Sequence, residues 1–459
     1  MGKNIKLKNI LRAITEFSNT LPLEEKMFCL LLEELIIDIV MQVEYKSNLK
    51  LFSRWNSIVD FIKHIPWIIL WKIKYLLFYN KNDNKAILSH IVFNSKSSYS
   101  TMQLLANKYK ILIIGALHSK KMLLSRNIFC FVSIFHKKQK LNLEFIEKIY
   151  NYCLTLFKKY EIELSSYKQF KQQIEIKYRI YTKYKNIYNK IDQFSLSISD
   201  FIFHNYNYLY QITKEKGKKN ILFDHGIIFY DNLYENLISD YYLACGEYDY
   251  YKNKNTGKKD IVGIVGKNYN FIRTKTDSQK KYILYILSPY FYSFARTEGR
   301  NLNYSVKYYN KFCQVSKYYF SDKRIMLRAH PVDKINKLKK EFGGKFYQNN
   351  LNKIIDNIAF CMVEDTSLAL DLLSYDIPII YIPDQFGIEH IKFSKFNLNI
   401  SLPYENISYG NIQKILKENE ENFEKRQQIY EYYYAPFEKN KFMEIIDEAI
   451  QSSSNNCHL

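Results

Sequence analysis

Two neighbouring hydroxyl side chains, Thr366 and Ser367, stand where a continuously apolar segment gives way to a helical pattern. The apolar segment, 358–363, is typical of a strand buried on both faces of a parallel sheet. Residues 368–375 then predict a helix, and 377–382 the next strand. A helix N-terminus offers unpaired N–H groups and the positive end of the helix dipole, so a phosphate held there would also meet both hydroxyls. The same two residues equally suit a plain helix cap.

Residues able to do chemistry also follow two other predicted strands. Asp224-His225-Gly226 comes directly after the apolar stretch 220–223. His330-Pro331 follows the stretch 324–328, which ends in Arg328. Ligands of doubly wound sheets bind outside the carboxyl ends of the strands, so the three positions together predict a binding site.

The first of these segments offers two candidate bases. His225 has an ordinary pKa of about 6.5, whereas Asp224, near 3.9, is a weak base unless it is desolvated. Adjacent residues leaving a strand point to opposite faces, so one of the two is expected to reach a substrate hydroxyl. We favour His225 as the base and Asp224 as a group that binds or orients the acceptor. The reverse assignment stays open.

The other two segments carry groups that suit phosphate. His330, Thr366 and Ser367 would donate to the charge that develops on a departing nucleotide. Arg328 would neutralise phosphate, or would form a structural ion pair. The chain lacks an Asp-x-Asp or histidine-cluster motif, and Glu364-Asp365 is interpreted as part of the helix cap, so neither a metal nor a cofactor is expected.

The order of these motifs resembles that of bacterial GT-B glycosyltransferases, especially the sialyltransferases and polysialyltransferases of lipooligosaccharide and capsule synthesis. Their acidic-acidic-Gly motif, often followed by Tyr, corresponds here to Asp224-His225-Gly226 with Tyr230. Their His-Pro and Ser-Ser/Thr motifs correspond to His330-Pro331 and Thr366-Ser367. The resemblance covers roughly residues 200–383.

The resemblance implies an α/β fold with two doubly wound, Rossmann-like domains facing a cleft. It further implies metal-independent, inverting transfer of a sugar, foremost sialic acid, from a CMP-activated donor to a bacterial surface glycan. The first domain would bind the acceptor and the second the nucleotide-sugar donor.

Two departures point to a related family. His225 occupies the second acidic position, and the hydroxyl pair is Thr-Ser. CDP-glycerol glycerophosphotransferase-like enzymes are similar in having His-Gly in the first place, Arg-x-His-Pro, which residues 328–331 match, and Asp-x-Ser-Ser, which residues 365–367 match loosely. The alternative function is therefore transfer of a glycerol- or ribitol-phosphate unit from a CDP-activated donor.

The chain is long enough for two domains and an appendage. We expect a helical N-terminal extension over 1–85, an acceptor-side domain over 86–270 and a donor-binding domain with C-terminal helices over 271–459. The remaining expected strands are 90–94, 110–115, 128–134, 200–204, 239–246 (the last of the first half) and 282–289.

The net charge of +21 would attract phosphate, nucleic acid or an anionic membrane. Lys, Asn, Ile and Tyr are abundant together, as AT-rich coding would produce, so part of this charge is discounted. Since no RNA-recognition, zinc-finger or basic-zipper signature occurs, nucleic acid is not an expected partner. Seven dispersed cysteines without a C-x-x-C pair fit a reducing cytoplasm.

The segment 58–79 is the most apolar part of the chain. Lys63, His64, Lys72 and Lys74 interrupt it, so it is not expected to span a bilayer. Two interpretations stay open: a helix lying in the inner face of the membrane, which would make the protein peripheral, or a helix packed on its own domain. The first, together with the net charge, is the basis for a third functional alternative, a non-enzymatic scaffold bound to membrane or nucleic acid.

Overall fold

The structure is a computed structural model that describes residues 3–18, 20–22, 28, 54–79, 86–90, 96–114, 120–131, 142–162, 164, 167–191, 194–199, 206–223, 239–253, 256–265, 280–288, 302–330, 335–348, 351–364, 366–384, 387, 389 and 391–455. They form two compact units. Unit 1 holds the described residues up to 265 together with 435–455, and unit 2 holds those of 280–434.

Unit 1 is built on a parallel sheet of seven strands, in the order β3-β2-β1-β4-β5-β6-β7. The first six strands along the chain have the classical Rossmann order 3-2-1-4-5-6, so the strand order reverses between β1 and β4. The strands are β1 Ala86–His90, β2 Lys110–Ile114, β3 Ile128–Phe131, β4 Leu196–Ser199, β5 Lys219–Phe223, β6 Tyr241–Ala244 and β7 Lys258–Ile261.

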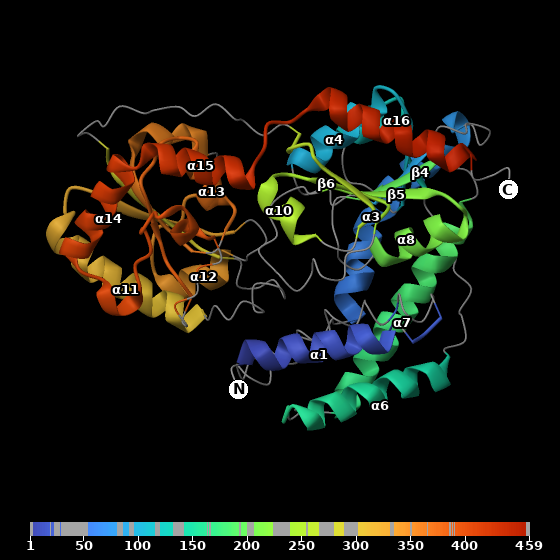
Figure 1. The fold of residues 1–459 in the computed structure, drawn as a ribbon, viewed down its shortest axis with the longest axis horizontal. Coiled ribbons are helices and arrows are strands. Elements are labelled where there is room, and N and C mark those ends of the chain that lie inside the picture. The colour runs from blue at the N-terminus through green and yellow to red at the C-terminus, as the bar shows by residue number, and fades with distance from the viewer. Residues whose placement is uncertain are drawn as a thin grey trace. The chain divides into compact units, whose positions relative to one another are not determined.

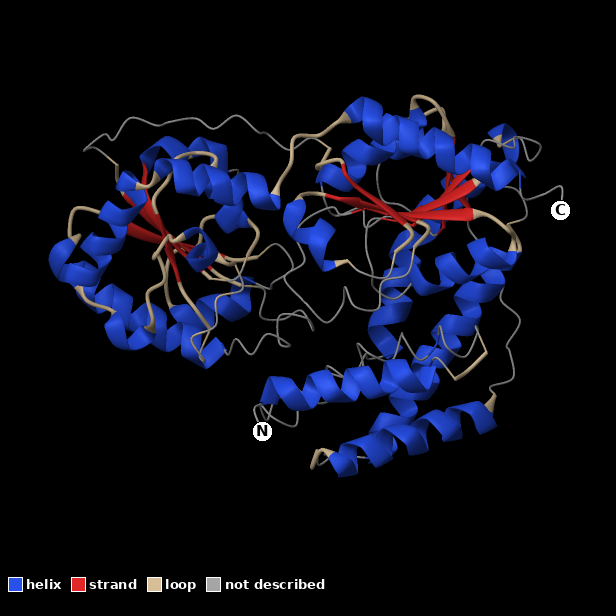
Figure 2. Cartoon of the chain, in the orientation of Figure 1, coloured by secondary structure: helices blue, strands red, loops and turns tan. Residues whose placement is uncertain are grey.

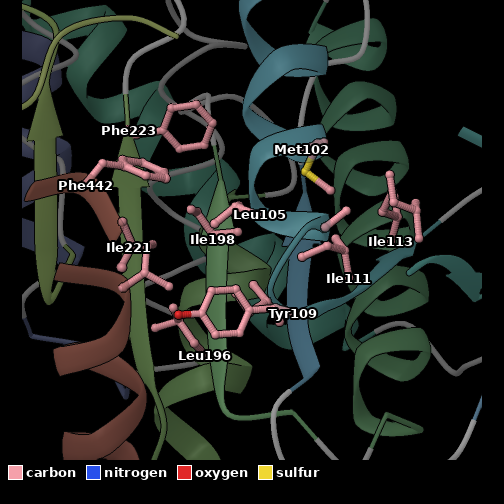
Figure 3. Close-up of a cluster of buried hydrophobic side chains, with 14 of the residues drawn as sticks. Met102, Leu105, Tyr109, Ile111, Ile113, Leu196, Ile198, Ile221, Phe223 and Phe442 are labelled. Atoms are coloured by element: carbon pink, nitrogen blue, oxygen red, sulfur yellow. The ribbon is translucent and has the colours of Figure 1, made fainter. Parts of the chain in front are cut away.

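Helices cover both faces of this sheet (Figure 2). Alternation along the strands sends Leu196 and Ile198 to one face, against α4 and α16, where they join the cluster drawn in Figure 3. On the opposite face, Leu88 and Leu112 belong to a second hydrophobic cluster, in which α8 lies against β4 and β5 and residues of α1, α6 and α7 extend the cluster away from the sheet. The helices of the unit are α1 Lys3–Ser18, α3 Arg54–Phe78, α4 Lys96–Ala106, α5 Lys120–Leu124, α6 Leu143–Lys159, α7 Tyr167–Asn189, α8 Tyr206–Glu215, α10 Glu247–Lys252 and α16 Lys439–Asn455.

The last helix, α16, belongs to unit 1 although it follows unit 2 in the chain (Figure 1). Its Phe442 and Ile446 are buried against the first sheet. Its Ser453 hydroxyl accepts a hydrogen bond of 3.0 Å from the Lys219 backbone N–H. The expectation that all C-terminal helices belong to the domain 271–459 is therefore wrong for α16. The sequence shows that this helix has an apolar face, but not which sheet that face covers.

Unit 2 contains a parallel sheet of four strands, in the order β11-β10-β8-β9. Single bridges from Phe346 to β9 and from Ser401 to β11 extend the sheet by one paired residue at each edge. Counted with these bridges, the order is again 3-2-1-4-5-6, and it reverses between β8 and β10. The strands are β8 Tyr282–Ile286, β9 Arg324–Arg328, β10 Ile358–Val363 and β11 Ile379–Tyr381.

The helices of unit 2 complete a second α/β layer structure (Figure 1). They are α11 Leu302–Tyr319, α12 Ile335–Phe342, α13 Leu368–Leu373, α14 Tyr409–Glu421 and α15 Phe423–Tyr433, with short 3-10 turns at Leu351–Lys353, Ile355–Asn357, Phe393–Phe396 and Tyr404–Asn406. Two parallel, doubly wound α/β units confirm the expected fold class.

Most expected strands are found where the apolar runs predicted them, and two are displaced. The strand expected at 90–94 begins earlier, as β1, and shares with it only His90, while 91–94 lie outside the described residues. The strand expected at 200–204 also lies outside them, directly after β4. β6 is not the last strand of its half, because β7 pairs with it. Serines in β1 and β4 interrupt the apolar pattern, which explains the displacement.

A buried arginine ties the edge of the second sheet to its helices. Arg426 of α15 is 1% exposed, and its guanidinium donates to Asp376 Oδ1 at 2.8 Å and to the Ile377 carbonyl at 2.9 Å. Desolvation lowers the pKa of Arg426, and the Asp376 carboxylate opposes that shift. Asn419 of α14 exchanges two hydrogen bonds of 2.9 Å with the backbone of Ile379. Together these bonds fix residues 376–379, the segment that leads into β11, against α14 and α15.

Within the described residues, no helix is both long and apolar enough to cross a membrane. The helix α3, which contains the apolar segment 58–79 up to Phe78, packs on unit 1 through Trp71, which is fully buried.

We predict that Arg426→Met destabilises unit 2, because it leaves the Asp376 carboxylate and the Ile377 carbonyl without this donor. Breaking a buried pair from one side costs about 3–5 kcal/mol. Hydrogen exchange measured by mass spectrometry should show faster exchange in peptides from 358–381. Lys417→Met, which removes a largely exposed i,i+4 pair with Glu421, is the matched control and should change little. Unchanged exchange in the Arg426 variant would show that packing and the Asn419 hydrogen bonds hold β11 without Arg426.

Candidate active site

The carboxyl ends of the second sheet's strands lie level with one another. Ile286 of β8 pairs in register with Arg328 of β9 and with Val363 of β10, and Val363 pairs with Tyr381 of β11. The residues that follow these four strands therefore emerge at one edge of the sheet. The segments around His330 and Thr366 therefore leave the same edge of this sheet.

A buried carboxylate spans the point where the strand order reverses. Glu364 directly follows β10, is fully buried, and its Oε2 accepts a hydrogen bond of 2.8 Å from the Ser288 backbone N–H after β8. Its own backbone N–H donates to the Ile286 carbonyl at 3.1 Å. Glu364 thus joins the two segments that flank the switch point, where doubly wound sheets bind ligands. The sequence does carry a signal for this role, because Glu364 comes directly after an apolar run. A carboxylate buried at such a position needs a hydrogen-bond partner.

The interpretation of Glu364 as part of a helix cap is therefore wrong, since its carboxylate bonds to the neighbouring strand's loop. The cap is made by Thr366, whose Oγ1 accepts from the Leu368 backbone N–H at 3.3 Å. Ser367, which precedes α13 with helical backbone angles, makes no side-chain cap bond and is partly exposed. Of the two hydroxyls, Ser367 is the one that the cap leaves available. Because α13 has only six residues, its dipole contributes less than that of a long helix.

His330 follows β9 after one buried residue, Ala329, and its ring is largely enclosed. Burial lowers the pKa of His330 from 6.5 to about 4, because an imidazolium loses its hydration there. Near neutral pH the ring is therefore uncharged, and it offers one N–H donor and one acceptor nitrogen. Burial therefore favours His330 as an uncharged N–H donor.

Arg328, the last residue of β9, brings a positive charge to the same edge. Its side chain is half-buried, and desolvation lowers its pKa while Tyr347 opposes that shift. A guanidinium remains protonated even so, because its ordinary pKa exceeds 12. The backbone carbonyl of Arg328 accepts from the Leu287 N–H at 3.0 Å, which holds this residue beside β8.

The expected acceptor-side residues Asp224, His225, Gly226 and Tyr230 lie outside the described residues, as do Pro331 and Asp365. The structure does establish the strand that precedes them. β5 ends at Phe223, in register with Leu243 of β6, so Asp224 follows the carboxyl end of a central strand in unit 1.

In the ranges that the structure describes, no group of three or more His, Cys, Asp or Glu side chains is arranged to hold a metal ion. The donor set at the second sheet consists instead of an imidazole, a guanidinium and hydroxyls. Groups of these kinds are chemically suited to binding an anion.

No protein-family model and no curated protein matches the chain. Solved structures share its general architecture at very low sequence identity. MurG from Acinetobacter baumannii is 7% identical, with 79% of this chain and 99% of that chain covered at a TM-score of 0.43. The MnaA–UDP structure from S. aureus is 10% identical, covering 80% and 97% at 0.46. A structure of the wall teichoic acid polymerase TagF is 13% identical, covering 88% and 100% at 0.38.

We predict that phosphate binding near His330 raises its pKa from about 4 toward or above its ordinary value. The chain has nine histidines, so the resonance of this one is assigned in ring-labelled protein by its loss in His330→Gln. NMR titration with and without CMP should show the shift, since a nearby anion favours the protonated ring. An identical titration curve in both samples would argue against phosphate at His330.

The same group predicts a pH dependence of stability. Its folded pKa of about 4 lies below the unfolded value near 6.5, so the unfolded chain takes up the proton first as the pH falls. Relative to His330→Gln, the wild-type protein should therefore lose stability between pH 6.5 and 4 and show no further relative loss below it.

Proposed function

We propose that this chain is a glycosyltransferase that uses a nucleotide-activated sugar donor and binds the donor phosphate in unit 2. The supporting observation is that Arg328, His330 and Ser367 stand at or just after the level carboxyl ends of β9 and β10, at the sheet edge where Glu364 spans the switch point. An imidazole N–H, a guanidinium and a hydroxyl are the donors that a phosphate leaving group requires.

The motif order favours a CMP-activated acidic sugar, sialic acid, as the donor and a bacterial lipooligosaccharide or capsule glycan as the acceptor. The acceptor hydroxyl attacks the anomeric carbon as the bond from that carbon to the CMP phosphate breaks. Attack opposite the leaving group inverts the anomeric configuration. The acceptor proton passes to a base, and CMP departs with the bonding electrons.

The groups of unit 2 suit a metal-independent departure of CMP. Neutral His330 can donate its N–H to a phosphate oxygen without the repulsion that an imidazolium would exert on Arg328. Fixed donors in a partly desolvated site stabilise developing charge better than water does, because they need no reorganisation. Ser367 Oγ would add a third donor at the start of α13.

The base on the acceptor side is proposed to be His225, with Asp224 orienting the acceptor or the imidazole. Both residues follow the carboxyl end of β5, the kind of position from which ligands are bound in doubly wound sheets. The ordinary pKa of histidine suits proton removal near neutral pH.

An alternative function is transfer of a glycerol- or ribitol-phosphate unit from a CDP-activated donor. His225 and the sequence Arg328-Ala329-His330-Pro331 favour it. The reaction would join the acceptor oxygen to phosphorus and would also release CMP. A scaffold without catalytic activity is the third alternative, favoured only by net charge and the apolar segment of α3. For either enzyme we propose a cytoplasmic location at the inner face of the membrane, where surface-glycan acceptors are built.

The first experiment offers CMP-sialic acid or CDP-glycerol with a lactose-terminated acceptor and identifies products by mass. We expect a sialylated product, with a rate reduced roughly 10²–10³-fold in His330→Ala through loss of one phosphate donor. Tyr318→Ser, at a largely exposed position on α11, is the matched control. Glycerol phosphate on the acceptor would establish the alternative. If neither donor is consumed and CMP binds equally weakly to wild type and His330→Ala, the proposal fails.

The second experiment separates the two candidate bases. His225→Ala should lower the rate by about 10²–10⁴-fold and remove the acidic limb of the pH–rate profile, because a general base must be deprotonated to act. Asp224→Asn should retain that limb, since it alters only orientation. The opposite pattern would assign the base to Asp224.

A further inference from the structure

The side of α3 that packs on unit 1 carries a lysine, Lys74, which donates hydrogen bonds to backbone carbonyls. Trp67, Trp71, Lys74 and Tyr75 share one side of the helix, with the i, i+4, i+7 and i+8 spacing of a single face. Trp71 is fully buried. The Lys74 ammonium reaches past the helix to the carbonyls of the segment before β3, donating to Leu123 at 2.9 Å, to Ser125 at 2.5 Å and to Ile128 at 2.6 Å.

These bonds fix the orientation of α3, because releasing Lys74 would leave three backbone acceptors without this donor. Burial lowers the pKa of Lys74 to about 8, so the ammonium form still predominates near neutral pH. The orientation of α3 is therefore held by specific polar contacts as well as by the packing of Trp67 and Trp71.

The opposite side of α3 exposes large apolar residues. Their exposed fractions run from 46% at Leu70 to 69% at Leu76. Leu124 is 75% exposed and lies between two of the residues whose carbonyls bind Lys74, so it extends the same surface. We call this surface the α3 apolar face: Ile69, Leu70, Ile73, Leu76, Leu77 and Leu124. Contiguous exposed apolar surface of this kind marks an interaction site.

The part of the sequence that contains the α3 apolar face is strongly basic. Between residues 61 and 143 the chain has 14 Lys and Arg but one acidic residue, Asp83, so this stretch supplies a net +13 of the chain's +21. Lys72 on the rim of the face and Arg126 beside Leu124 are both exposed. AT-rich coding would raise the lysine content throughout the chain, but it does not explain the near absence of Asp and Glu from one segment.

We propose that the α3 apolar face binds the surface of an anionic lipid bilayer. Leucine and isoleucine side chains would enter the headgroup boundary, while the lysines and arginines would meet lipid phosphates. A second copy of the chain fits this surface less well, because it would bring two strongly basic surfaces together. The same repulsion opposes a basic protein partner. This inference does not depend on the donor chemistry proposed above.

The experiment is cosedimentation of the full chain with vesicles of phosphatidylcholine alone or with about one third phosphatidylglycerol. We expect binding to the anionic vesicles and binding at least tenfold weaker to the neutral ones at low salt. Leu76→Ser/Leu77→Ser should weaken binding to anionic vesicles at least tenfold, since both side chains lose the apolar surface that would be buried. Tyr318→Ser on unit 2, which removes an equally exposed aromatic ring, should bind as the wild type does.

A second pair of variants tests the electrostatic contribution. Lys72→Glu/Arg126→Glu should lower binding to anionic vesicles and leave the weak binding to neutral vesicles unchanged. Raising the salt concentration should reduce wild-type binding toward that of this variant, because exposed charges are screened.

All three tryptophans of the chain, Trp55, Trp67 and Trp71, lie on α3, so tryptophan emission reports whether α3 stays packed in each variant. Wild-type binding that is equal for neutral and anionic vesicles, or absent from both, would overturn the proposal. So would unaltered vesicle binding by a Leu76/Leu77 variant whose tryptophan emission is native. Conversion of a dimer to a monomer by that variant, with vesicle binding unchanged, would assign the face to a second copy.

Discussion

The level pairing of β8 with β9 and β10 is the constraint on which the candidate site depends. Parallel pairing in this register brings residues separated by 76 positions, Ser288 and Glu364, into a hydrogen bond of 2.8 Å. A backbone bond of the same ladder, from the Leu287 N–H to the Arg328 carbonyl, holds the end of β9 next to the segment that contains Ser288. A shift of one residue would turn each strand's side chains to the opposite face and separate these groups. The buried Glu364 carboxylate is a second tie across the same point, so strand register and site geometry support one another.

The two sheets share a strand order but differ in how the chain completes them. The final helix of unit 1, α16, follows unit 2 in the chain. Its Phe442 and Ile446 pack against one face of the first sheet. Unit 2 instead closes its edge with α14 and α15, through Asn419 and the Arg426–Asp376 pair. A helix that returns to unit 1 after unit 2 makes unit 1 discontinuous in sequence. A division of the sequence into consecutive domains, such as the expected 86–270 and 271–459, therefore assigns α16 to the wrong unit.

Burial changes the chemistry of the residues at the second sheet. His330 is uncharged near neutral pH because it is enclosed, while the Arg328 guanidinium stays charged in a half-buried place. The pair therefore combines a neutral donor with one cation. The Thr366 hydroxyl caps α13, whereas the adjacent Ser367 hydroxyl makes no cap bond and is available to a ligand. None of these distinctions follows from residue type, because each depends on what surrounds the side chain.

The sequence alone determined the α/β class and the strands whose apolar runs are uninterrupted, such as β8 and β10, because burial on both faces leaves a continuous signature. It also identified the segments that leave their carboxyl ends. Only the tertiary structure decided the role of Glu364, the neutral state of His330 and the unit to which α16 belongs. It also decided which side of α3 faces outward, since the half-buried Lys74 and the exposed leucines reverse the usual pattern. These properties depend on contacts between distant segments, which local periodicity does not encode.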